Sequence, residues 1–129
     1  MRRFSYFIIL PAIYFLSGCS DKTNSLEVTA SAYTSHPNET DSTPSLAAWG
    51  DTLKPGMKAI AVSRDLIKKG LRPGVEVSIE GLEGKYKVLD KMNKRWRQKI
   101  DIYMGKDINK AKDWGNRKVT IHWVSEEPS

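Results

Sequence analysis

The sequence predicts a mostly β domain, a small closed barrel of about six short strands with one or two short helices. Two observations favour this class: apolar and polar residues alternate in several short stretches, and turn residues separate those stretches. The predicted strands are residues 28–33, 59–62, 75–79, 86–90, 100–104 and 119–124. A chain of 129 residues can bury a modest core in one such domain without disulfides. We therefore expect one folded domain over residues 28–125.

Each predicted strand has its own pattern. In residues 28–33, Val and Ala alternate with polar residues, as in a half-buried strand. Residues 59–62 (Ala-Ile-Ala-Val) are apolar throughout, which favours a fully buried strand. Residues 75–79 alternate again, and Gly81 to Gly84 predict a hairpin connection to the strand at 86–90.

Two helices are predicted between these strands. Arg64 to Lys69 can form one or two turns that end at Gly70. Asp107 is a suitable N-cap for a helix running to Trp114, with Gly115 as the C-terminal stop. We expect Trp114 and Trp123 to lie in the core.

The N-terminus predicts export and lipidation. Arg2 and Arg3 precede an apolar run of about a dozen residues, too short to cross a bilayer and typical of a signal peptide. Leu16-Ser17-Gly18-Cys19 resembles the lipobox of bacterial lipoproteins. The interpretation is a signal over residues 1–18, a lipidated tether over 19–27 that starts at Cys19, and a membrane contact through the lipid. Ser20 in place of Asp favours the periplasmic face of the outer membrane.

The net charge of +6 favours anionic partners outside the cytoplasm, such as cell wall or lipid headgroups. The sequence contains no basic array interleaved with aromatic residues, so we expect no nucleic-acid partner. We also expect a monomer. His36 and His122 have no neighbours at metal-ligand spacing, so we expect neither a metal nor another cofactor. The polar loop from Ser35 to Pro44 is long for a small domain, and long loops are often functional.

Two carboxylates have an unusual context. Asp90 ends one apolar strand, and Asp101 lies between Ile100 and Ile102, although β propensity disfavours aspartate in a strand. If both isoleucines face the core, Asp101 faces a groove or solvent. Two interpretations are open: a surface aspartate paired with a nearby Lys or Arg, or a functional acid.

Five segments resemble the 3D domain family, which is named for three aspartates and includes the catalytic domain of membrane-bound lytic transglycosylase A. The most specific is the Asp-Ile-Tyr-x-Gly context of Asp101, eleven residues after Asp90. The other four are Thr29–Tyr33, Ala48–Asp51 with Ile60–Val62, Val75–Val77, and the closing stretch from Ala111 through Trp114-Gly115 to Val124. This resemblance implies a double-psi β-barrel, shared more distantly with proteins similar to rare lipoprotein A.

The chain departs from the family pattern at two places. Residues Lys91 to Lys99 are cationic and aromatic where catalytic members have a glycine-rich loop. Ser63 stands where the first aspartate belongs, and Asp65 follows two residues later.

The resemblance implies lytic transglycosylation: cleavage of the bond between N-acetylmuramic acid and N-acetylglucosamine in peptidoglycan. Asp101 would be the acid/base, Asp90 its charged neighbour and Asp65 a third candidate. Predicted substrate contacts are Tyr33, Thr34, Trp49, Arg95 and Trp96. The alternative function is a non-catalytic, peptidoglycan-binding envelope lipoprotein.

Overall fold

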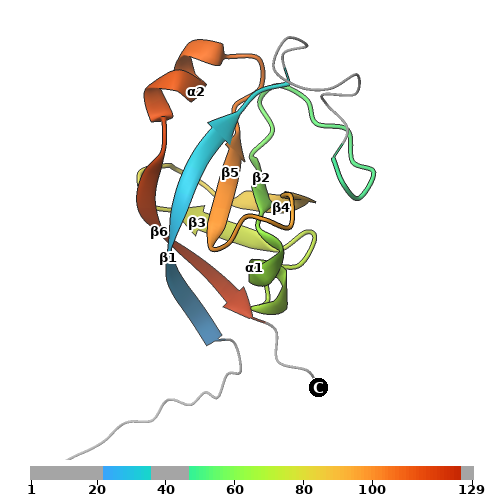
Figure 1. The fold of residues 1–129 in the computed structure, drawn as a ribbon, viewed down its shortest axis with the longest axis vertical. Coiled ribbons are helices and arrows are strands. Elements are labelled where there is room, and N and C mark those ends of the chain that lie inside the picture. The colour runs from blue at the N-terminus through green and yellow to red at the C-terminus, as the bar shows by residue number, and fades with distance from the viewer. Residues whose placement is uncertain (1–21, 36–46, 126–129) are drawn as a thin grey trace, which may run out of the picture.

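Six strands close into a barrel in the order β1-β5-β2-β4-β3-β6 (Figure 1). A computed structural model describes residues 22–35 and 47–125. The strands are β1 (Lys22–Tyr33), β2 (Ala59–Val62), β3 (Glu76–Ile79), β4 (Tyr86–Lys91), β5 (Lys99–Tyr103) and β6 (Arg117–Ser125). The predicted fold class, a mostly β barrel with two short helices, is confirmed; its double-psi detail stays a prediction. No helix within the described ranges is long and apolar enough to cross a membrane.

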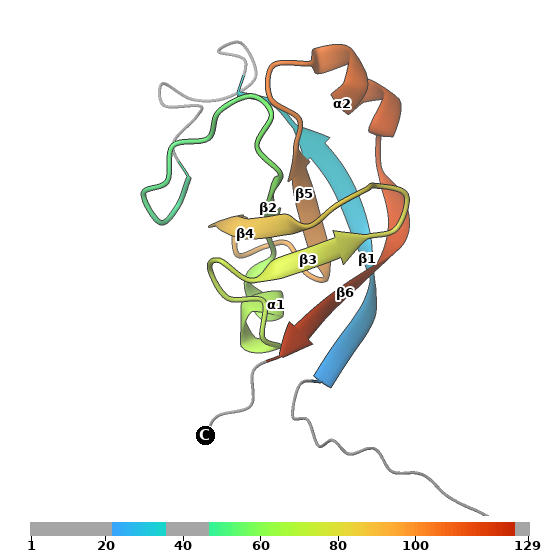
Figure 2. The same cartoon turned by 180° about the vertical axis from the view of Figure 1, so that it is seen from behind.

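Pairing around the barrel mixes two directions. Strand β1 runs parallel to β5, and β2 runs parallel to β4. The β2–β5, β3–β4, β3–β6 and β1–β6 pairs are antiparallel. Figure 2 shows β3 and β4 lying in front of β5. Four of the six strands thus have one parallel and one antiparallel neighbour, which local sequence patterns do not reveal.

Strand β1 begins at Lys22, six residues before the predicted start at Val28. Residues 22–27 pair with β6 from Ser125 back to Thr120. Their backbone groups are therefore satisfied by the ladder, and Leu26 packs against the core although most of the segment is exposed. The predicted tether over 19–27 thus overlaps the strand from Lys22 onward, while Cys19 lies outside the described residues.

The core is built from the inward-facing residues of all six strands. Five representative side chains, Ile60, Val62, Ile100, Ile102 and Ile121, are 0 % exposed. The predicted burial of Trp114 and Trp123 is confirmed. The indole N–H of Trp114 donates to the Ala30 carbonyl at 3.1 Å, so this aromatic ring is both packed and hydrogen-bonded.

The two helices sit near opposite ends of the barrel (Figure 1). Helix α1 (Arg64–Lys68) follows β2 directly, and helix α2 (Ile108–Trp114) lies against the end of β1. The Asp107 side chain accepts a hydrogen bond from the Lys110 N–H at 3.0 Å, which confirms the predicted N-cap. Gly115 ends the helix with φ +64°, a conformation that favours glycine.

Removing residues 22–27 tests their role as strand. A protein that begins at Val28 should have a free energy of unfolding about 2 kcal/mol or more below one that begins at Ser20, because several ladder hydrogen bonds are lost, each contributing about 1 kcal/mol. Urea unfolding of both proteins measures the difference. Equal stability would mean that residues 22–27 act only as a tether.

Candidate functional site

The site is centred on β2, which lies between β4 and β5. Ala61 is paired with Asp90 on β4 and with Asp101 on β5, so the two aspartates flank one small side chain. Residues opposite each other in neighbouring strands project from the same face of a sheet. Two strand spacings separate their Cα atoms, about 10 Å, and the side chains can approach more closely. The two predicted acids therefore share one face of the barrel.

A break in the β2–β4 register sets this arrangement. Ile60 is paired with Val88, whereas the next residue, Ala61, is paired with Asp90. In a regular ladder Leu89 would lie opposite Ala61. The extra residue on β4 is a β-bulge, a feature that often re-aims a side chain beside a functional site.

Asp101 lies on the outer face of the barrel, as the alternation with Ile100 and Ile102 predicts. It is half-buried, and its Oδ1 accepts a hydrogen bond from the Ser31 hydroxyl at 3.1 Å. Burial raises the pKa of Asp101, the charge of Asp90 raises it further, and Ser31 and Lys99 partly oppose this rise. The carboxyl group is thus biased toward its protonated form, as a general acid requires.

Asp90 is held in place by backbone donors. Its Oδ1 accepts from the Ala48 N–H at 2.7 Å and from the Lys91 N–H at 2.9 Å. The first bond fastens the segment that precedes β2 to the side of the site. That segment adds Ala47 and Leu53 to a second apolar cluster with Ala59 and Tyr103, separate from the barrel core. The hydrogen bond to Asp90 and these apolar contacts hold the segment beside the two acids.

Tyr33 connects the acids to this second cluster. Its ring lies 5.5 Å from that of Tyr103, centroid to centroid, and the Tyr103 hydroxyl is 2.9 Å from Ser35 Oγ. Burial raises the pKa of Tyr33, and the charges of Asp90 and Asp101 raise it further. The phenol therefore stays protonated. Its buried hydroxyl has no hydrogen-bond partner among the residues described, an uncommon state for a buried polar group.

Asp65 is engaged elsewhere. It lies in α1, where its carboxylate accepts the Gln98 N–H at 3.0 Å. Burial alone would raise its pKa, but hydrogen bonds from the Ser63 hydroxyl and the Gln98 N–H, with the charge of Arg97, lower it overall. A carboxyl group with a lowered pKa is a poor proton donor. The predicted catalytic role is thus not favoured, and Asp65 instead joins α1 to the loop before β5.

This cationic loop, residues 91–99, is anchored rather than open. Gln98 has φ +48°, a strained conformation for a non-glycine residue, and its side chain donates to the Glu27 carbonyl at 2.7 Å. The Lys99 ammonium lies 3.7 Å from the centroid of the Trp96 ring, and the Arg95 guanidinium lies 5.0 Å from it. A cation thus already covers part of the indole that was predicted as a sugar platform.

The remaining predicted contacts fall in different environments. Trp49 is half-buried against the main core, which leaves part of its ring accessible. Arg95 is exposed and free to meet a ligand. Thr34 is 0 % exposed, so a polymer on the present surface cannot touch its side chain. His36 and most of the predicted long loop lie outside the described residues.

Two residues of the site were not predicted. Ser31 contributes the hydrogen bond to Asp101, and Lys99 contributes a positive charge that opposes the rise in the Asp101 pKa. Ser31 and Tyr33 are alternate residues of β1 and face outward together, as do Lys99 and Asp101 on β5. What the sequence does not show is the parallel β1–β5 register, which sets Ser31 opposite Asp101 and Thr29 opposite Lys99.

Comparison with protein-family models gives no match for this chain, and no curated protein matches it. Within the described ranges, no group of three or more His, Cys, Asp or Glu could hold a metal ion. The chemistry of the site must therefore be argued from its own side chains.

The titration of Asp101 tests how Ser31 and Asp90 change its pKa. Its pKa should lie above the ordinary value of about 3.9, because burial disfavours the charge. Ser31→Ala should raise it further and Asp90→Asn should lower it. Carbon-detected NMR of the aspartate carboxyl groups measures each shift.

The same shift predicts a dependence of stability on pH. Because the folded state holds the Asp101 proton more tightly than the unfolded chain does, this contribution is full below about pH 3.9 and is lost as the pH rises through the raised pKa. Asp101→Asn should remove this part of the pH-dependent decrease in the free energy of unfolding, which urea unfolding measures at each pH. A wild-type pKa at or below the ordinary value would contradict the desolvated setting.

Proposed function

We propose that the protein is a cell-envelope lipoprotein that acts on peptidoglycan, by lytic transglycosylase-like cleavage between N-acetylmuramic acid and N-acetylglucosamine. The observation that carries this proposal is the pair Asp101 and Asp90 on either side of Ala61, with the Asp101 pKa raised. The resemblance of the Asp90–Asp101 region to the 3D domain family supplies the substrate class. Lipidation of Cys19 would hold the domain on the periplasmic face of the outer membrane.

In this mechanism Asp101 serves first as acid and then as base. Its carboxyl proton passes to the glycosidic oxygen, the C1–O bond breaks, and positive charge develops at C1 and the ring oxygen. The C6 hydroxyl of the same muramic acid attacks C1 and gives its proton to the Asp101 carboxylate. A 1,6-anhydro product forms, the acid is regenerated, and no water is consumed.

The neighbouring side chains fit supporting roles. The negative charge of Asp90 favours the protonated form of Asp101 and can stabilise the developing cation. No second carboxylate nucleophile is needed, because the C6 hydroxyl takes that part, unlike in ordinary retaining glycosidases.

Asp101→Asn tests the proposal directly. It should lower the release of anhydro-muropeptides from purified sacculi by at least about 100-fold, because the transferable proton is lost while the shape of the side chain is kept. Mass spectrometry of the digest measures the products. The matched control is Asp113→Asn on the exposed side of α2, which should cleave at the wild-type rate. Cleavage by Asp101→Asn at the control rate would reject the assignment.

A second candidate function is wall binding without cleavage. It is favoured by the anchored cationic loop, where Arg95 and Lys99 lie beside Trp96 and the glycines expected of catalytic relatives are absent. Such a loop offers charge-assisted hydrogen bonds to the carboxylates of muramic acid and its peptides. Under this function Asp101 would contact the glycan and transfer no proton.

Sacculus pelleting separates the two functions. Arg95→Ala combined with Trp96→Ala should weaken pelleting several-fold under either function, because the loop loses a charge and a stacking surface. Lys112→Ala, an exposed cation on α2, serves as the control. Wild-type pelleting without any anhydro product between about pH 4 and 8 would favour binding alone. Unchanged pelleting by the double variant would exclude the loop from the contact.

A further inference from the structure

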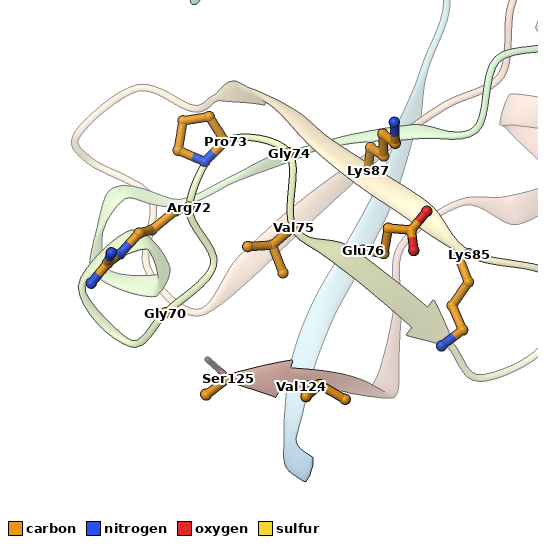
Figure 3. Close-up of a pocket in the computed structure, with 10 residues that line it drawn as sticks. All are labelled: Gly70, Arg72, Pro73, Gly74, Val75, Glu76, Lys85, Lys87, Val124 and Ser125. Carbon is orange, nitrogen blue, oxygen red and sulfur yellow. The ribbon is translucent and has the colours of Figure 1, made fainter. Parts of the chain in front are cut away.

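A hollow of about 690 Å³ opens on another part of the barrel, between the segment that follows α1 and the end of β6 (Figure 3). Its walls come from Gly70 and residues 72–76, from Lys85 and Lys87, and from Val124 and Ser125. Neither Asp90 nor Asp101 lines it. In Figures 1 and 2 this region lies toward the end of the barrel where β1 begins, away from α2.

The rim of the hollow is cationic. Three lining side chains, Arg72, Lys85 and Lys87, are positive, and one, Glu76, is negative. Glu76 lies directly opposite Lys87 in the β3–β4 register, which sets one charge against the other and leaves Arg72 and Lys85 in excess. Such a rim favours an anionic ligand.

The walls also offer apolar surface. Val75 and Val124 both line the hollow, and Val124 is 45 % exposed, unusual for a large apolar side chain. An occupant that carries hydrocarbon next to its charge suits these walls.

The position of the hollow indicates where such an occupant comes from. Ser125, in its wall, is paired with Lys22 at the start of β1. Cys19 precedes Lys22 by three residues, which can span at most about 10 Å. A lipid on Cys19 would therefore hold this end of the barrel at the membrane surface. Lys68 and Lys69, both exposed, immediately precede Gly70 and add charge to the same end.

We infer that this hollow and its rim form a membrane-facing surface that binds the phosphate headgroup of an anionic phospholipid. Arg72 and Lys85 would contact the phosphate, while Val124 would rest against the apolar edge of the lipid layer. The inference rests on the proposed anchor at Cys19 for its orientation and does not depend on glycan cleavage. With this end on the lipid, the α2 end of the barrel is directed away from the membrane.

Vesicle cosedimentation of the unacylated chain, residues 20–129, tests the inference. This part contains every strand and all core residues of the barrel. It should bind vesicles of phosphatidylcholine with phosphatidylglycerol and not vesicles of phosphatidylcholine alone. Arg72→Glu combined with Lys85→Glu should lower the partition onto anionic vesicles at least about tenfold.

The matched control changes the same charge at the α2 end. Lys106→Glu combined with Lys110→Glu should lower partition by less than about twofold, since these exposed residues lie away from the hollow. Equal losses in both double variants would assign binding to overall charge and overturn the inference. So would equal binding to the two kinds of vesicle.

Two further measurements complete the test. If circular dichroism shows that Arg72→Glu with Lys85→Glu is unfolded, Arg72→Gln with Lys85→Gln is used instead, with a loss of about fivefold or more expected. If the hollow variants lose sacculus pelleting but keep vesicle binding, the hollow takes wall carboxylates and the inference fails. Because the vesicle assay contains no glycan and the protein carries no acyl chain, its result is independent of cleavage and of acylation of Cys19.

Discussion

The site depends on one constraint, the placement of a short buried strand between two partners. All four residues of β2 are buried, and both edges of the strand are hydrogen-bonded, to β4 and to β5. Its register can hardly slip, because a shift of one residue would expose Ile60 and Val62 and bury the outer face. The same register sets Asp90 and Asp101 beside Ala61, so the stability of the core and the geometry of the acids have one cause.

The bulge on β4 shows how local irregularity serves this arrangement. With the extra residue, Leu89 packs against the second apolar cluster while Asp90 lies opposite Ala61. The two backbone N–H groups that bind Asp90 come from the segment before β2 and from the next residue on β4. The acid is thus positioned by the strand and held by the loop.

How far the sequence predicts this structure depends on the range of the interactions. The strands, the cap at Asp107 and the outward direction of Asp101 follow from neighbours a few residues away, and all three were predicted. The start of β1 at Lys22, the bulge at Leu89 and the pairing of Ser31 with Asp101 depend on contacts between distant segments. The hydrogen bond between Asp65 and Gln98 depends on a contact of the same kind, because the two residues are 33 positions apart.

Three local costs meet near Asp101. The acid itself is desolvated, the buried Tyr33 hydroxyl has no partner among the described residues, and Gln98, three residues before Asp101, has a left-handed backbone. The unpaired Tyr33 hydroxyl and the Gln98 backbone each cost on the order of 1 kcal/mol or more. Features that break local rules without a structural gain concentrate at functional sites. Their meeting on one face of β1, β5 and β2 therefore argues that this face contacts a ligand, whether or not the bond to the sugar is then broken.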